Sequence, residues 1–112
     1  MTSINRTDSF VKSNEYTLEV ERTVSHVEGW LSHREGRLLY ALAKKCPAET
    51  SIVEIGSFEG KSAIWLASGS KRGNQIKVYS IDPHRGGTEG TFIRNIMRFG
   101  LDDVIRRDAK VS

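Results

Sequence analysis

Two acidic residues and two glycines are spaced around short apolar segments in a way that could hold a nucleoside-containing ligand. Glu54 lies within the apolar segment 52–55, and Gly56 and Gly60 follow it. Asp82 closes the next apolar segment, about 20 residues beyond Gly60. In α/β proteins a strand, a glycine-containing turn, a helix and an acid at the tip of the next strand each contact a different part of such a ligand. The pattern therefore indicates a cofactor-binding turn.

The spacing within this turn argues against two kinds of phosphate-binding loop. A Walker-type loop needs four residues between its glycines, whereas three separate Gly56 from Gly60. Glu59 would also repel a triphosphate. In a dinucleotide fingerprint, Phe58 would occupy the position of the second glycine, which lets the pyrophosphate approach the backbone. The turn is therefore better suited to a ligand that is not held by phosphate groups.

The charges around the turn indicate which groups that ligand carries. Glu54 costs several kcal/mol to bury in an apolar strand unless a cation or hydrogen-bond donors satisfy it. The helix that begins near Gly60 offers free backbone amides to a carboxylate. Asp82 lies where an acid accepts hydrogen bonds from both ribose hydroxyls. A ligand with an ammonium, a carboxylate and an adenosine is S-adenosylmethionine, which the sequence therefore predicts as the cofactor.

The segment 53–62, together with 78–84, resembles the first two motifs of class I S-adenosylmethionine-dependent methyltransferases. The likeness is greatest to the sugar and small-molecule O-methyltransferases, the group that includes macrocin O-methyltransferase, and it extends over residues 29–108. The resemblance implies a Rossmann-like fold and a small-molecule acceptor, such as a hydroxyl on a sugar or another natural product. It covers the cofactor-binding portion of such an enzyme, so the acceptor half is expected to lie outside these residues.

The same resemblance implies roles for individual residues. Glu54 would be the motif acid near the methionine end of the cofactor, Gly56 the turn beside it, and Ser62 a partner of the methionine carboxylate. Asp82 would bind the ribose, and Asp108 would meet the adenine amino group. The complete set of expected cofactor-binding residues is Glu54, Gly56, Ser57, Gly60, Ser62, Asp82 and Asp108. No catalytic residue or metal ligand is identified, and dependence on a divalent metal stays open.

Structural roles are the alternative for three of these residues. Glu54 could form a salt bridge with Lys61 or Arg37. Asp82 could cap a turn at the proline that follows it, and Ser62 could be an early-helix polar residue without a ligand. For the chain as a whole, the alternative function is a non-catalytic truncated fragment or interaction module that keeps a vestigial cofactor pocket.

Two amphipathic helices are expected ahead of the glycine turn. Apolar residues at helical spacing predict a helix over 15–28 that ends at Gly29. Ser32 and Glu35 form a capping-box pattern that starts a second helix, which Pro47 stops. The apolar stripe of this second helix is expected to consist of Leu38, Leu39, Leu42 and Ala43.

The rest of the chain is expected to be an α/β, Rossmann-like unit. Strands are predicted over 52–55, over 76–81 and from 104 onward, with helices from 63 to a glycine loop at 69 and over 91–99. Right-handed crossovers then give a parallel sheet with the strand order 3-2-1. The strand at 52–55 would be an exposed edge of an incomplete sheet, with which a second copy could pair to form a homo-oligomer.

The expected organisation is a flexible N-terminus over 1–14, a helical lead-in over 15–46 and a partial cofactor-binding domain over 47–112. A net charge of +3, without a basic run interleaved with aromatic residues, argues against direct nucleic-acid binding. No apolar stretch is long enough to span a bilayer. Cys46 is the only cysteine, so no internal disulfide is expected, which favours a cytoplasmic location.

Overall fold

The computed structural model describes residues 13–108 except 28, 57–59 and 83–86. Its sheet has three parallel strands in the order β1-β2-β3, namely β1 (Ile52–Ile55), β2 (Val78–Ile81) and β3 (Ile105–Asp108). The helices of this described part are α2 (Glu15–Val24), α3 (His33–Lys45), α4 (Lys61–Arg72) and α5 (Glu89–Arg98). The expected α/β class, the two leading helices and the strand order are confirmed.

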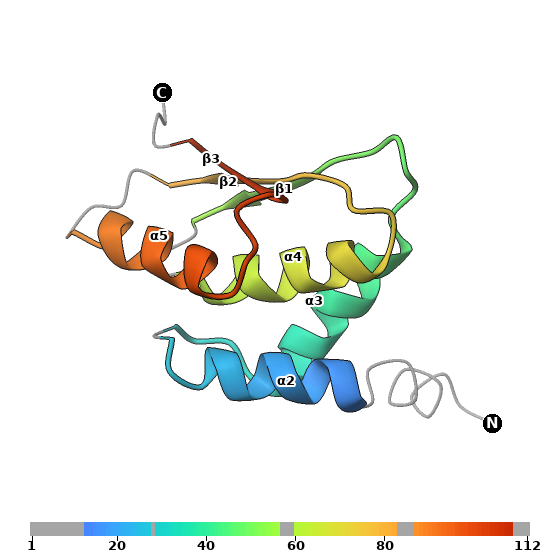
Figure 1. The fold of residues 1–112 in the computed structure, drawn as a ribbon, viewed down its shortest axis with the longest axis horizontal. Helices are drawn as coiled ribbons and strands as arrows, with labels where there is room; N and C mark the ends of the chain where they lie inside the picture. Colours follow the sequence, from blue (N-terminus) through green and yellow to red (C-terminus); the bar gives the residue numbers. More distant parts are fainter. Residues whose placement is uncertain (1–12, 28, 57–59, 83–86, 109–112) are drawn as a thin grey trace.

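All of these helices lie on one side of the sheet (Figure 1). Helices α4 and α5 lie nearest the strands, and α3 and α2 lie beyond them. The core between sheet and helices contains Val78 and Phe92, which are fully buried. On the other face of β1, Val53 and Ile55 are 60% and 80% exposed. Within the described residues β1 pairs only with β2, so it is an edge strand as expected, and its pairing with a second copy stays a prediction.

Helices α3 and α4 approach each other closely because glycines lie at their contact. A Cβ atom on Gly36 of α3 would stand 2.1 Å from the indole of Trp65. A Cβ on Gly69 of α4 would stand 2.2 Å from the carbonyl oxygen of Tyr40, and one on Gly73, the C-cap residue of α4, would stand the same distance from that of Lys44. Contacts repeat every four residues along both helices, which is the ridge spacing of close helix packing.

The packing face of α3 differs from the expected apolar stripe. Leu38 and Leu42 are 37% and 51% exposed, whereas Tyr40, which was not expected in the stripe, is buried together with the expected Ala43. The helix turns this face toward α4 because Gly36 and Tyr40 fit against the indole of Trp65, with the Tyr40 and Trp65 rings edge to face at 6.5 Å. The expectation was wrong for Leu38 and Leu42, because counting large apolar residues ignores the contact area that a glycine opens, and it is confirmed for Ala43 and for Leu39, which packs against the core.

Several element boundaries also differ from those expected. Helix α2 ends at Val24 and not at 28, since the backbone tightens there and the amide of Val27 donates to the carbonyl of Val24 at 2.9 Å. Helix α4 continues through Gly69 to Arg72, because close packing on α3 requires that glycine within the helix. Both α2 and α3 begin with the capping-box arrangement, which confirms Ser32 and Glu35 as the start of α3. None of the described helices is long and apolar enough to cross a membrane.

Candidate cofactor-binding site

The carboxyl ends of the three strands meet at one edge of the sheet. Ile55, Ile81 and Asp108 are register partners across the strands, so the residues that follow β1 and β2 lie at the same edge. The amide of Gly56 donates to the carbonyl of Ile81 at 2.9 Å, which joins the turn after β1 to the end of β2. Asp82 follows Ile81 directly and is half-buried. The parallel sheet therefore places the backbone of Gly56, Asp82 and Asp108 at one edge, and their role in binding a cofactor stays a prediction.

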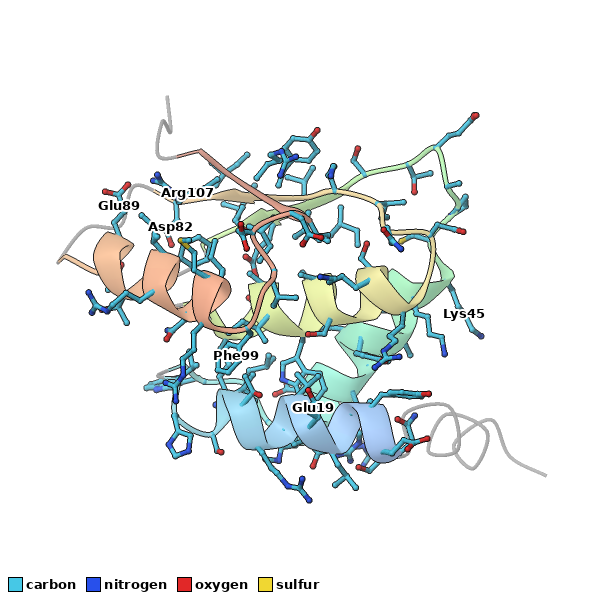
Figure 2. The ribbon with its side chains drawn as sticks, viewed as in Figure 1. Glu19, Lys45, Asp82, Glu89, Phe99 and Arg107 are labelled. Atoms are coloured by element: carbon cyan, nitrogen blue, oxygen red, sulfur yellow. The ribbon has the colours of Figure 1, made fainter. Side chains whose placement is uncertain are left out.

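Figure 2 shows Asp82, Glu89 and Arg107 at this same end of the molecule, where α5 begins. Glu89 lies in the first turn of α5 and forms an ion pair with Arg107 of β3. This pair holds the start of α5 against the carboxyl half of β3. The beginning of α5 therefore lies beside the edge that carries Asp82.

Glu54 is held by hydroxyl donors from two different elements. The Ser80 hydroxyl, on the facing residue of β2, donates to Glu54 Oε1 at 3.0 Å. The Ser62 hydroxyl, in the first turn of α4, also donates to the Glu54 carboxylate. A carboxylate can accept about four hydrogen bonds, and the two hydroxyls are not the only groups that interact with Glu54. These hydrogen bonds orient the half-buried Glu54 carboxylate and stabilise its negative charge.

The two glycines of the turn, Gly56 and Gly60, have different structural roles. Gly56 has a φ of +85°, and a Cβ built on it would meet nothing within 4 Å, so its open side can be approached closely. Gly60 has a φ of +99° and is the N-cap residue of α4. A Cβ on Gly60 would stand 2.9 Å from the ring of Phe92. Gly56 therefore leaves space at the edge, and Gly60 sets the direction and packing of α4.

The remaining expected site residues are placed as follows. Ser62 supports Glu54 in this structure, a contact that spacing alone did not indicate. Lys61 and Arg37, the proposed salt-bridge partners of Glu54, contact the N-terminal segment: Lys61 Nζ donates to the Gly29 carbonyl at 3.3 Å, and Arg37 pairs with Glu21 at 3.2 Å. Ser57 and the side chain of Asp108 lie outside what the structure describes.

Trp30 is a residue of this region that sequence reasoning did not place in the site. Its side chain is fully exposed, which is unusual for a tryptophan. The neighbouring Gly29 packs against the Lys61 side chain, with 3.4 Å between a Cβ built on Gly29 and Lys61 Cβ. Because Lys61 follows Gly60, the segment that carries Trp30 lies beside the start of α4. A large aromatic residue next to a glycine at a predicted turn was the available signal.

Comparisons with known proteins agree with this fold. A family model described as "Methyltransferase domain" matches residues 53–109, which is about half of the chain. Among solved structures, the crystal structure of an SAH-bound methyltransferase of Podospora anserina, PaMTH1, matches with a TM-score of 0.65 at 15% sequence identity. That match covers 95% of this chain and 48% of the Podospora chain. No curated protein matches.

The chain therefore belongs to the methyltransferase domain family. The likeness to PaMTH1 shows the fold, and this chain spans about half the length of that protein. Membership of the family supports S-adenosylmethionine as the cofactor. Among the described residues no cluster of three His, Cys, Asp or Glu side chains could hold a metal ion, and dependence on a metal stays open.

Proposed function

We propose that this chain forms the S-adenosylmethionine-binding portion of a methyltransferase that methylates a hydroxyl group of a sugar or another small molecule. The observation that carries the proposal is the Glu54 carboxylate, which Ser80 and Ser62 hold beside the open turn at Gly56. A fixed, half-buried carboxylate next to a backbone without a side chain fits a ligand that presents an ammonium group close to the chain.

In this proposal the edge residues divide the cofactor among them. Glu54 accepts hydrogen bonds from the methionine ammonium, and Gly56 lets the ligand approach the backbone. Asp82, half-buried at the end of β2, accepts from the ribose hydroxyls. Asp108, at the end of β3, lies one strand further along, where the adenine would follow the ribose. The order of the strands therefore matches the order of the ligand's parts.

Trp30 is the residue that we assign to the acceptor side. Its exposed ring lies on the segment beside the start of α4, so an acceptor could stack on it while the methyl donor lies at the strand ends. When S-adenosylmethionine is bound, its sulfonium supplies the methyl group. The contribution of the chain is to hold donor and acceptor in line, since proximity supplies much of the acceleration in such transfers.

Isothermal titration calorimetry with S-adenosylhomocysteine tests the cofactor assignment. We expect the chain to bind it, and Asp82→Ala to weaken binding about tenfold or more because two ribose hydroxyls lose their acceptor. Asp102→Ala is the matched control, since Asp102 is an exposed residue before the amino end of β3. Equal affinity of wild type and Asp82→Ala, or no heat at all, would reject the assignment.

The alternative function, a non-catalytic module with a vestigial pocket, predicts a different result from the same protein. A vestigial pocket would give no measurable binding, although the chain folds. Thermal unfolding with and without S-adenosylhomocysteine separates the two, because a ligand that binds the folded state raises the unfolding temperature. A cooperative transition that the ligand does not shift would favour the alternative.

A further inference from the structure

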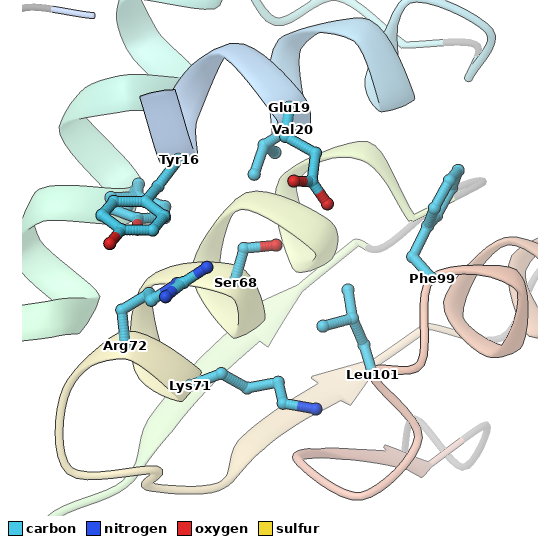
Figure 3. Close-up of a pocket in the computed structure, with 9 residues that line it drawn as sticks. Tyr16, Glu19, Val20, Ser68, Lys71, Arg72, Phe99 and Leu101 are labelled. Atoms are coloured by element: carbon cyan, nitrogen blue, oxygen red, sulfur yellow. The ribbon is translucent and has the colours of Figure 1, made fainter. Parts of the chain in front are cut away.

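A cavity of about 350 Å³ lies at the other end of α4 from Gly60. It is bounded by α2, by the last turns of α4 and by the segment that follows α5 (Figure 3). Glu19 from α2 and Arg72 from α4 line it, and Val20 and Leu101 provide apolar wall. The volume is at the lower end of the range of small-molecule sites. The α4 residues that line it, Ser68, Lys71 and Arg72, belong to the second half of this twelve-residue helix, whereas the strand edge adjoins its first turn.

The cavity has one negative and one positive side chain that no described residue neutralises. Neither Glu19 nor Arg72 takes part in an ion pair within the described part of the chain. Lys71, which also lines the cavity, is engaged: its Nζ donates to the Gly100 carbonyl at 3.0 Å and lies 3.3 Å from Asp103. Arg72 and Glu19 are therefore the charges that a ligand would meet.

Arg72 is held in position by an aromatic ring. Its guanidinium carbon lies 3.8 Å from the centroid of the Tyr16 ring, so the two groups are stacked. Stacking reduces the freedom of the arginine side chain while its N–H groups, which lie in the guanidinium plane, can still donate at their outer edge. The geometry suits recognition of a planar carboxylate by two parallel hydrogen bonds.

Tyr40 adds a buried donor next to Arg72. The residue lines the cavity and is 96% buried, and its hydroxyl has no hydrogen-bond partner among the described residues. Burial raises the pKa of this phenol, and the nearby charge of Arg72 acts in the opposite direction. Trp65 also has a buried N–H without a described partner, but the backbone of α3 at Gly36 covers it. Of these two buried groups, the Tyr40 hydroxyl belongs to a residue that lines the cavity, and the Trp65 N–H does not.

We propose that this cavity binds a small zwitterion of the amino-acid type, with its carboxylate on Arg72 and its ammonium on Glu19. The Tyr40 hydroxyl donates a further hydrogen bond to the carboxylate, and an aliphatic side chain packs on Val20 and Leu101. A phosphate or another dianion fits less well, because Glu19 would repel it across a cavity of this size.

Two-dimensional NMR titration of the full chain tests the proposal with three matched probes. These are L-leucine, 4-methylpentanoate, which lacks the ammonium group, and isopentylamine, which lacks the carboxylate. We expect L-leucine to give saturable shifts of amides near residues 16–20, 68–72 and 99–101. Each single-charge probe should bind about fivefold to tenfold more weakly. Equal binding of all three probes, or shifts that do not saturate, would overturn the proposal.

Arg72→Gln and Tyr40→Phe provide the variants, and Arg94→Gln, an exposed arginine on α5, is the control. Arg72→Gln should weaken L-leucine binding about tenfold and Tyr40→Phe about threefold, while Arg94→Gln leaves it unchanged. Tyr40→Phe should do so without lowering the unfolding temperature, because it removes a buried hydroxyl that has no partner among the described residues. If Arg72→Gln binds L-leucine as tightly as wild type, the proposed site is wrong.

Discussion

Ser80 donates a hydrogen bond of 3.0 Å to Glu54 across the two strands that form the centre of the candidate site. Because Ser80 is buried, its removal leaves a carboxylate oxygen without one of its donors. We expect Ser80→Ala to lower the free energy of unfolding by about 1–2 kcal/mol. Urea denaturation measures this change. Ser51→Ala, an exposed position just before β1, is the control, and an equal loss in both variants would show that the hydrogen bond contributes nothing specific.

The two glycines of the turn allow the cost of backbone conformation to be separated from the cost of packing. Gly56→Ala places a side chain at a positive φ in open space and should cost about 1–2 kcal/mol. Gly60→Ala places it at a positive φ and 2.9 Å from the Phe92 ring, so it should cost about 2–4 kcal/mol. Chemical denaturation of both variants gives the comparison. Equal losses would mean that Phe92 moves aside without penalty.

The close contact between α3 and α4 predicts opposite effects for two helical glycines. Gly69→Ala would bring a methyl group to 2.2 Å from the Tyr40 carbonyl oxygen and should destabilise the fold by more than about 2 kcal/mol. Gly90→Ala, near the start of α5, meets only a flexible arginine at 3.7 Å and should stabilise by about 0.5–1 kcal/mol. Thermal unfolding of the two variants tests this. Stabilisation by both would contradict the observed helix spacing.

Tyr40 predicts a pH dependence of stability at alkaline pH. Burial raises its pKa in the folded state above the value of about 10 of an unfolded chain. The unfolded chain therefore loses the phenolic proton first, and folding stability falls as the pH rises above about 10. Wild type should lose more stability than Tyr40→Phe between about pH 9 and pH 11. Denaturation at these two pH values checks the difference, and parallel losses in the two proteins would rule out Tyr40 as the cause.

Most of the fold could be predicted because its signals are local. The capping box at Ser32 and Glu35 fixed where α3 begins, and the apolar segment 52–55 predicted β1 over the observed residues. The burial of Gly36 and Tyr40 on α3 could not be predicted, because it depends on which residues α4 presents to that helix. Gly69 has no side chain and so adds nothing to an apolar pattern. Its contribution to the close approach of α3 and α4 is evident only from the packed pair of helices.

Those features of the candidate site that depend on the order of the strands could be predicted. Those that depend on which residues of β1 and β2 face each other could not. Alternation of strand and helix sufficed to place Gly56 and Asp82 at one edge. The support of Glu54 by Ser80 requires that β1 and β2 align without a shift, which no single segment of sequence encodes. Trp30 is distant in sequence from the turn, and its placement depends on the contact between Gly29 and Lys61.

The glycine contacts of α3 and α4 pair Gly36 with Trp65, Tyr40 with Gly69 and Lys44 with Gly73, always at the same separation along the chain. A slide of one helix by a turn would replace all three of these pairs, so together they define the observed docking register. Helix α4 starts at the turn that we assign to the cofactor, and α2 is joined to α3 through Glu21. The turn assigned to the cofactor and the N-terminal helices therefore belong to one continuously packed unit, joined through α4 and α3.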